Sequence, residues 1–247
     1  MSKVILTFAG SGDTLGSGGK LQTCIHVEAE SSTFLMDCGA SSLPALKHLN
    51  IDLNSIDTIF ITHLHGDHFA GIPFFVLDAQ LSANRSDPLT VVGPPGIESR
   101  VSEAMEVMFP GLSDVDQRFE IAYKEYSEGT SLSVNDVSVT PYQVVHPSGA
   151  PPFAVQIEVD GRTVGYSGDT EWTEALIEVA QGCDVFIAEA YFYDKSIPYH
   201  LDYATLIEHQ AELDCEHLII THMNADLLDR LQEIDLQHAF DGKTVRI

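Results

Sequence analysis

The segment that most restricts the fold of this 247-residue chain is a short apolar strand running directly into a cluster of histidines. Residues 57–62 (Asp-Thr-Ile-Phe-Ile-Thr) are mostly apolar and β-branched, the pattern of a strand buried on both faces. His63, His65, Asp67 and His68 follow at once. Three imidazoles and a carboxylate at the end of a buried strand are hard to explain as core or as a solvated face, so we expect them to form a site.

The spacing of these side chains suits two metal ions. Residues i and i+2 of an extended chain face the same way, so His63 and His65 can point to one ion. Gly66 lets the chain turn, and Asp67 and His68 then emerge in another direction, toward a second ion. Nitrogen and oxygen ligands of this kind suit Zn²⁺, Mn²⁺ or Fe²⁺.

Other candidate ligands lie where later apolar strands end. His146, Asp169 and His222 each follow such a strand, and Asp37 ends an early one. Loops at strand ends, held by a rigid sheet, are common places for ligands. The remaining histidines lack this context and are interpreted as surface or packing residues: His26, His48, His209, His217 and His238.

The order of the expected elements favours two sheets packed face to face with helices outside them. No internal repeat or linker divides the chain, so we expect a single domain over residues 1–247. Strands are predicted at 4–8, 23–29, 33–37, 57–62, 89–92, 119–123, 130–134, 137–145, 153–159, 163–166, 185–190 and 217–220. Helices are predicted at 41–49, 72–83, 96–108, 173–180, 203–213 and 227–233.

Charge restricts the partners. The chain has 12 Lys plus Arg and 37 Asp plus Glu, a net charge of −25, which repels phosphate backbones and anionic membranes. A small-molecule substrate is therefore favoured over tRNA or other nucleic acid, and no segment reads as a signal peptide or a membrane span. The four cysteines show no C-x-x-C spacing and indicate buried thiols in a reducing cytoplasm: Cys24, Cys38, Cys183 and Cys215.

A glycine-rich segment, residues 10–19, follows the first strand. Thr14 and Leu21 break the Walker A pattern, and Leu15 breaks the Rossmann fingerprint. We therefore interpret the segment as a loop between strands that could form one wall of a site.

The motif His63-x-His65-x-Asp67-His68, followed by His146, Asp169 and His222, resembles the metallo-β-lactamase superfamily, and Asp37 matches its first motif. The resemblance implies an α+β fold, a four-layer αββα sandwich of two mixed β-sheets with helices on the outer faces. It also implies a dinuclear metal site in which one ion takes His63, His65 and His146, the other takes Asp67, His68 and His222, Asp169 bridges them, and Asp37 orients ligands from beside the site.

Residues 62–73 and 167–170 resemble the ribonuclease Z branch and its small phosphodiesterase relatives. In that branch a Glu and a later His pair near the metals, and the His is a proposed proton donor. Glu189 and His200 fall in the matching interval of this sequence. The alternative interpretation is that Glu189 is only a charge at a strand end and His200 only a loop residue. Only 169 − 146 = 23 positions separate His146 from Asp169, and residues 147–152 contain no Lys or Arg. The basic tRNA-clamping arm of ribonuclease Z is thus missing.

The resemblance implies a metal-dependent hydrolase with a metal-bridging hydroxide, most simply a phosphodiesterase acting on a small phosphodiester. Zn²⁺ is the first choice for its two divalent ions, with Mn²⁺ or Fe²⁺ as alternatives. Asp67 or Asp169 would hold the hydroxide, and His200, paired with Glu189, would protonate the leaving group. A lactonase, thioesterase or other esterase on the same metals, and a non-catalytic metal-binding or regulatory protein, stay as alternatives, and a homodimer is left open. Four aromatic residues are assigned equally to pocket lining or core: Phe69, Phe74, Tyr191 and Tyr193.

Overall fold

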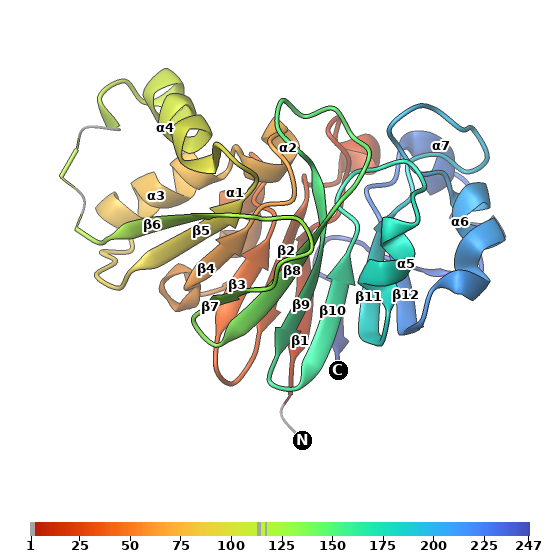
Figure 1. The fold of residues 1–247 in the computed structure, drawn as a ribbon. Coiled ribbons are helices and arrows are strands. Elements are labelled where there is room, and N and C mark those ends of the chain that lie inside the picture. The colour runs from red at the N-terminus through yellow and green to blue at the C-terminus, as the bar shows by residue number, and fades with distance from the viewer. Residues whose placement is uncertain (1–2, 113–114, 117) are drawn as a thin grey trace.

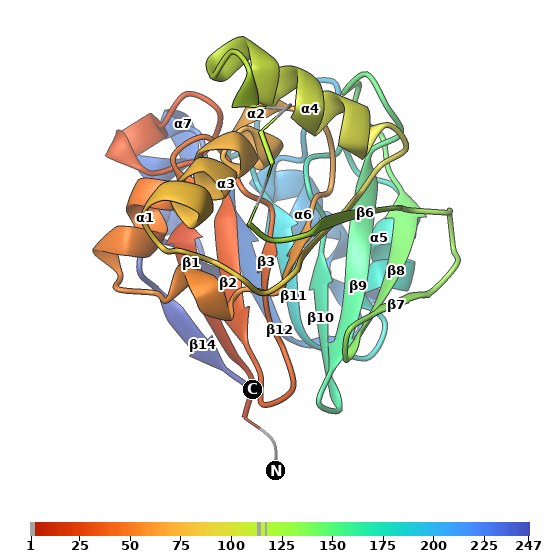
Figure 2. The ribbon, with the colours of Figure 1, turned by 90° about the vertical axis from the view of Figure 1, so that its left-hand side faces the viewer.

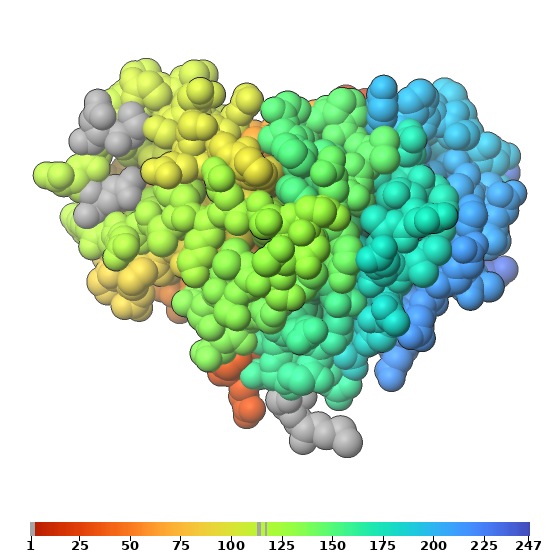
Figure 3. Space-filling view, in the orientation of Figure 1, coloured from red at the N-terminus to blue at the C-terminus, as the bar shows by residue number. Residues whose placement is uncertain are grey.

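The computed structural model describes residues 3–112, 115–116 and 118–247, which form two β-sheets packed face to face between outer layers of helices (Figures 1 and 2). This confirms the predicted αββα sandwich. In the space-filling view, the yellow-green helix α4 (Ile97–Met108) and the blue helix α6 (Tyr203–His209) lie on opposite flanks of a central green surface (Figure 3).

The first sheet has, from edge to edge, β14 (Thr244–Arg246), β1 (Ile5–Gly10), β2 (Cys24–Glu28), β3 (Thr33–Met36), β4 (Thr58–Phe60), β5 (Leu89–Gly93) and β6 (Ile121–Glu125). The pairs from β14 to β3 are antiparallel, and the pairs from β3 to β6 are parallel. The sheet is therefore mixed, as expected.

The second sheet has the order β13 (Gln237–His238), β12 (Cys215–Thr221), β11 (Cys183–Glu189), β10 (Arg162–Tyr166), β9 (Phe153–Val159), β8 (Val137–Gln143) and β7 (Leu132–Val134). Its strands are antiparallel from β7 to β10 and parallel from β10 to β13. Carboxyl ends of parallel strands meet at one edge of a sheet, which brings the ends of β10, β11 and β12 together.

Helices cover the outer face of each sheet (Figure 1). The first sheet carries α1 (Ser42–His48), α3 (Ile72–Leu81) and α4, with the four-residue α2 (Gly66–Phe69) at its edge. The second carries α5 (Ala175–Ala180), α6 and α7 (Ala225–Leu228). Helix α4 shows how these helices pack on the sheets. Its buried residues Ile97, Val101 and Met105 recur every four positions, so they form one apolar stripe that faces the sheet.

Three apolar cores join the four layers. One fills the space between the sheets, and the other two lie between each sheet and its helices. Strand β3 contributes to two of them, because Phe34 and Met36 face the central core whereas Leu35 faces the helical side. This alternation follows from the two-residue period of a strand and explains why strands buried on both faces read as continuous apolar runs.

Several predicted elements differ from the structure. Residues 66–69 form helix α2 instead of an open turn, and Gly66 is not among the residues with positive φ. The helix predicted over 227–233 is divided into α7 and a 3-10 turn, Leu231–Glu233, because Arg230 leaves the helical region with φ −115°. The edge strands β13 and β14 were not predicted, since two- and three-residue strands carry too little pattern.

Two further observations bear on the sequence-based expectations. The cysteines are free thiols, of which Cys24, Cys38 and Cys183 are buried as expected, whereas Cys215 is only half-buried. Within the described ranges, no helix combines the length and apolar character that a membrane crossing requires.

Candidate metal centre

The predicted ligands converge on one edge of the sandwich because each lies at or just past a strand end. Asp37 follows β3, and His63 comes shortly after β4 in the first sheet. From the second sheet, Asp169 follows β10 and His222 follows β12, while Glu189 is the last residue of β11. Residues far apart in the sequence thus meet at the point where the two sheets present their parallel carboxyl ends.

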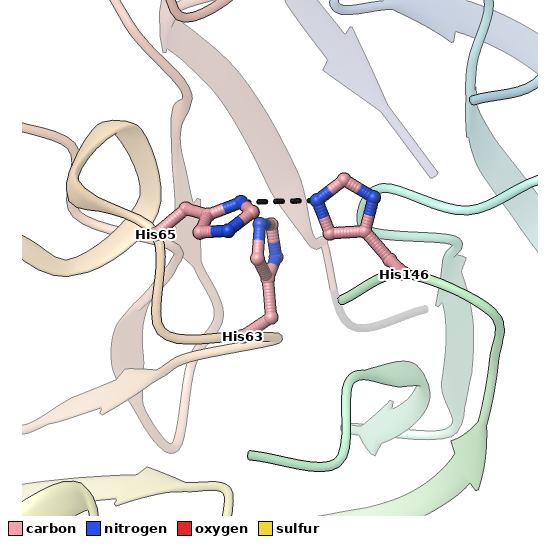
Figure 4. A group of neighbouring side chains, drawn as sticks. All are labelled: His63, His65 and His146. Carbon is pink, nitrogen blue, oxygen red and sulfur yellow. Dashed lines mark hydrogen bonds between the residues drawn. The ribbon is translucent and has the colours of Figure 1, made fainter. Parts of the chain in front are cut away.

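His63, His65 and His146 form the first group of candidate ligands. Their ring centroids lie 4.8–4.9 Å apart, and each can offer a nitrogen within 4.8 Å of the others. His65 Nδ1 and His146 Nε2 are 3.0 Å apart, as drawn in Figure 4, with His63 beneath the pair. The expected pairing of His63 with His65 is therefore found, although the chain between them is not part of a strand.

Asp67, His68, Asp169 and His222 form the second group, and all four side chains are buried. Asp67 Oδ2 lies 3.4 Å from His68 Nε2 and 3.3 Å from His222 Nε2. Asp169 Oδ1 lies 3.3 Å from His68 Nε2. The short helix α2 makes this possible, because it places Asp67 and His68 in successive positions behind His65.

Asp169 contacts both groups. Its Oδ1 lies 3.3 Å from His68 Nε2 of the second group. Its Oδ2 lies 3.6 Å from His222 Nε2 of the second group, 3.8 Å from His63 Nε2 and 3.9 Å from His146 Nε2 of the first. The carboxylate therefore lies between the two groups, as expected of a residue that could bridge two ions.

The side chains of both groups fit divalent metal ions. His63 Nε2, His68 Nε2 and Asp169 Oδ1 are buried without a hydrogen-bond partner among the described residues. Burying polar atoms in this way is costly unless they bind something. Ligand atoms about 2.0–2.2 Å from a tetrahedral ion lie roughly 3.3–3.6 Å from one another, close to the separations observed here.

Burial and neighbouring charges shift the pKa values of these groups strongly. Burial, followed by the proximity of His68, holds the pKa of His63 well below its ordinary value. Burial acts to raise the pKa of Asp169, but His222 and His68 outweigh it and hold that pKa well below its usual range. Burial acts to lower the pKa of His222, but Asp169 and Asp67 raise it to about 9. Protons and metal ions therefore compete for the same atoms.

Asp37 contacts a candidate ligand from behind the site. Its Oδ2 lies 2.6 Å from His68 Nδ1 and accepts a hydrogen bond from the Tyr166 hydroxyl at 3.0 Å, while Thr62 N donates to its Oδ1 at 2.8 Å. A histidine that uses Nδ1 in this way presents Nε2 to a metal, the usual arrangement around metal-binding histidines. Asp37 and His222 both have φ of 58°, a left-handed conformation that costs on the order of 1 kcal/mol or more in a non-glycine residue.

Glu189 and His200 form a pair beside the ligands. Glu189 is fully buried, its Oε2 lies 3.0 Å from His200 Nδ1, and Thr170 N donates to its Oε1. Burial and then Asp169 raise the pKa of Glu189. Burial acts to lower the pKa of His200, but the hydrogen bond and charge of Glu189 raise it above its ordinary value. The His200 ring stacks on Tyr191, with centroids 4.7 Å apart.

Two contacts were not anticipated from the sequence. Thr14 Oγ1, in the glycine-rich loop, donates a hydrogen bond to Asp67 Oδ2. His146 Nδ1 lies 2.9 Å from the carbonyl oxygen of Tyr199, a residue with φ of 72° next to His200. The Thr14 contact could not be predicted, because the glycine-rich loop matches no known binding motif. The Tyr199 contact could not be predicted, because every residue has a backbone carbonyl and the sequence does not show which one accepts a hydrogen bond.

A pocket of about 540 Å³ opens onto both ligand groups. It is lined by Thr14, Gln22, Ala40, His65, Gly66, Asp67, Ala70, His146, Asp169 and His200. The glycine-rich loop therefore supplies one wall through Thr14, as the sequence suggested. No lysine or arginine is among these lining residues.

The other histidines and most of the candidate aromatic residues lie elsewhere. None of the five histidines assigned to surface or packing joins a candidate metal group in the described ranges. Phe69 is part of the helical core of the first sheet, and Phe74 packs edge-on against Phe109. Tyr193 packs on Tyr203, so Tyr191 is the one of the four candidate aromatics that contacts a site histidine.

Comparison with known proteins agrees with this fold and site. A family model described as a beta-lactamase superfamily domain matches residues 32–223, well over half of the chain. The chain therefore belongs to the beta-lactamase superfamily, and the resemblance to metal-dependent hydrolases of this fold is confirmed.

Individual proteins are similar to this chain over most of its length. Ribonuclease Z of Bacillus subtilis (strain 168) is 27% identical over 276 aligned positions, which cover 89% of this chain and 88% of that protein. The metallo-beta-lactamase fold protein YhfI from Bacillus subtilis has a TM-score of 0.80 at 18% identity, covering 99% of this chain and 100% of its own. A diphosphatase from the PhnP family has a TM-score of 0.78 at 17% identity, covering 98% and 97%. These two structures support the fold.

Proposed function

We propose that this hydrolase is a dinuclear metal-dependent phosphodiesterase acting on a small phosphodiester. The observation that carries the proposal is the Glu189–His200 pair, which adds an imidazole with a buried carboxylate partner to a pocket already containing both ligand groups. Two comparisons support it, because a ribonuclease and a diphosphatase, by their names, both act on bonds between phosphorus and oxygen.

Each ligand group would hold one divalent ion, with Asp169 between them. The first group is His63, His65 and His146, and the second is Asp67, His68 and His222. Bound ions would supply an acidified water at neutral pH and positive charge for the substrate's phosphoryl oxygens. Imidazole-rich groups with one or two carboxylates favour Zn²⁺, and the same ligands accept Mn²⁺ or Fe²⁺.

The chain's own residues would orient the reactants and move a proton. Asp67 and Asp169 would hold the attacking water with their carboxylates. Asp37, whose Oδ2 lies 2.6 Å from His68 Nδ1, would keep His68 in the tautomer that presents Nε2 to a metal. Glu189 accepts from His200 Nδ1, which leaves Nε2 free to donate a proton to the leaving oxygen. Glu189 raises the pKa of His200, which favours the protonated form that a general acid needs.

Charge and pocket size favour a small substrate over RNA. The pocket of about 540 Å³ suits a drug-sized molecule and has no lysine or arginine in its lining. A protein with net charge −25 and no basic residue in 147–152 has little with which to neutralise a polyanion. An RNA substrate is the second candidate, and the name of the ribonuclease Z relative is what favours it.

A substrate panel tests the proposal. The protein is loaded separately with Zn²⁺, Mn²⁺ and Fe²⁺ and assayed on bis(p-nitrophenyl) phosphate, a lactone, a thioester and a single-stranded RNA. We expect hydrolysis of the phosphodiester and none of the RNA. Hydrolysis of the lactone or thioester with no cleavage of the phosphodiester would refute a phosphodiesterase. The matched control is His63→Ala, whose preparation should lose the activity together with bound metal.

A further inference from the structure

A second pocket also borders His200. It has a volume of about 410 Å³, and its lining includes His200, Trp172, Ser196 and Asp202. We call it the Trp172 pocket. His200 is the one residue that lines both this pocket and the pocket over the ligand groups. The proposed proton donor therefore borders both the place where phosphorus would be attacked and a second space to which the proposed mechanism assigns no role.

Trp172 gives this pocket a fixed aromatic wall. Its ring stacks on His209 with centroids 4.0 Å apart and an interplanar angle of 11°. His209 ends α6, and its Nδ1 lies 2.7 Å from Glu212 Oε1, so the stack is tied to the outer helical layer. An indole held on one face by a neighbouring ring keeps its remaining surface available for another planar group.

The polar lining of the pocket includes two carboxylates beside His200. Glu171 and Asp202 contribute carboxylates, and no lysine or arginine lines the pocket. Both carboxylates are already held in place, because Tyr199 N donates to Glu171 Oε2 at 2.9 Å and Thr205 N donates to Asp202 Oδ1 at 2.9 Å. These two carboxylates favour groups that carry N–H or O–H donors and disfavour a negatively charged group.

The loop that carries His200 also lines the pocket, through Ser196, Ile197, Pro198 and His200. Ile197 and His200 form an antiparallel bridge, and Tyr199 between them has φ of 72°. The carbonyl of Tyr199 accepts from His146 Nδ1, so the loop also orients a candidate metal ligand. A group bound against this loop would contact the same segment that positions the proton donor.

We propose that the Trp172 pocket binds the leaving group of the substrate. This leaving group would be an uncharged alcohol that carries an aromatic ring and hydrogen-bond donors, such as a nucleoside. The proposal rests on the proposed function. In the reaction, water forms the new bond to phosphorus and the bond from phosphorus to the alcohol oxygen breaks. His200 gives its proton to that oxygen and recovers one from the attacking water by way of solvent. The alcohol is then released from the Trp172 pocket.

Trp172 is the only tryptophan of the chain, so its fluorescence reports on this pocket directly. Metal-loaded protein is titrated with adenosine, and with cyclohexanol as a non-aromatic alcohol. We expect saturable quenching by adenosine and none by cyclohexanol. Quenching by neither, or by both equally, overturns the proposal.

Ser196 provides a matched pair of variants. It is exposed, it lines the pocket, and its side chain makes no hydrogen bond to another of the described residues. Ser196→Phe partly fills the pocket, whereas Ser196→Ala leaves it open. Because base–aromatic stacking is worth about 1–3 kcal/mol, we expect the dissociation constant for adenosine to rise by about fivefold or more in Ser196→Phe. It should stay unchanged in Ser196→Ala, and an equal change in both variants overturns the assignment of adenosine to this pocket.

Inhibition distinguishes failure of this proposal from failure of the proposed function. Adenosine should competitively inhibit hydrolysis of bis(p-nitrophenyl) phosphate by the unmodified protein, and the inhibition should weaken in Ser196→Phe. Hydrolysis that adenosine does not inhibit overturns the leaving-group assignment and leaves the phosphodiesterase standing. If adenosine quenches the fluorescence of a protein that cleaves no phosphodiester, both the leaving-group assignment and the phosphodiesterase are overturned. The Trp172 pocket is then only a binding site for adenosine.

Discussion

His200 Nδ1 lies 3.0 Å from Oε2 of Glu189, a carboxylate that is fully buried while the His200 side chain is 21% exposed. Glu189 therefore holds the His200 ring from a position that water does not reach, while the His200 ring itself is partly exposed to the pocket. The candidate metal ligand His146 packs against the same imidazole, with ring centroids 4.9 Å apart. The imidazole that we propose as the proton donor thus lies next to the place where a metal-bound substrate would lie.

The first prediction concerns the dependence on the leaving group. His200→Ala should lower kcat for a diester with an alkoxide leaving group by about 10²-fold or more, the usual contribution of a general acid. It should slow bis(p-nitrophenyl) phosphate much less, because p-nitrophenolate leaves without a proton. Steady-state kinetics on both substrates checks this. Equal slowing of the two would contradict the role of His200 as acid.

The second prediction concerns Asp169, which lies between the ligand groups with Oδ1 3.3 Å from His68 Nε2 and Oδ2 3.8 Å from His63 Nε2. Asp169→Ala removes a carboxylate that lies near ligands of both groups, so at least one metal ion should be lost. Elemental analysis of the purified variant measures this. Glu103→Ala, a change at an exposed carboxylate on helix α4, serves as the control and should retain the metal. Unchanged metal content in Asp169→Ala would rule out a bridging role.

Much of this site was predictable because it depends on strand ends. A buried strand must read as an apolar run, and a polar residue directly after it must lie at the sheet edge. That argument needs no knowledge of side-chain contacts, and it located Asp37, Asp169 and His222 on separate strands. Their convergence follows from the parallel pairing of β10, β11 and β12 and of β3 and β4.

What could not be predicted depends on short segments and on contacts across the fold. Helix α2 has four residues, about one turn, so no helical periodicity could develop over residues 66–69. The Thr14 contact joins residues 53 positions apart through a loop without a fingerprint. Trp172 and His209 stack across different elements, which neither residue's local sequence indicates.

The third prediction concerns Thr14, whose hydroxyl donates to Asp67 Oδ2. Thr14→Val keeps the shape of the side chain and removes the donor, so Asp67 would lose a partner that fixes its carboxylate. Changes to residues that orient metal ligands typically weaken metal binding by about 10–100-fold, and we expect a loss in this range. Competition with a chromogenic chelator measures the affinity of each ion. Thr14→Ser, which keeps the hydroxyl, should bind metal as the unmodified protein does, and a loss of affinity equal to that of Thr14→Val would argue against the hydrogen bond.

The last prediction concerns metal removal and stability. His63 Nε2, His68 Nε2 and Asp169 Oδ1 are buried without hydrogen-bond partners in the described part of the chain, so binding metal should stabilise the folded state over the unfolded one. With a free ion at 100 times its dissociation constant, the gain is about 2.7 kcal/mol, which corresponds to a rise in Tm of roughly 5–10 °C for a chain of this size. Thermal unfolding with Zn²⁺ and after treatment with a chelator measures the difference. In Asp169→Ala the same treatment should shift Tm less, because that variant has less metal to lose. A Tm that does not respond to chelation in the unmodified protein would mean that these ligand groups do not bind metal in the folded state.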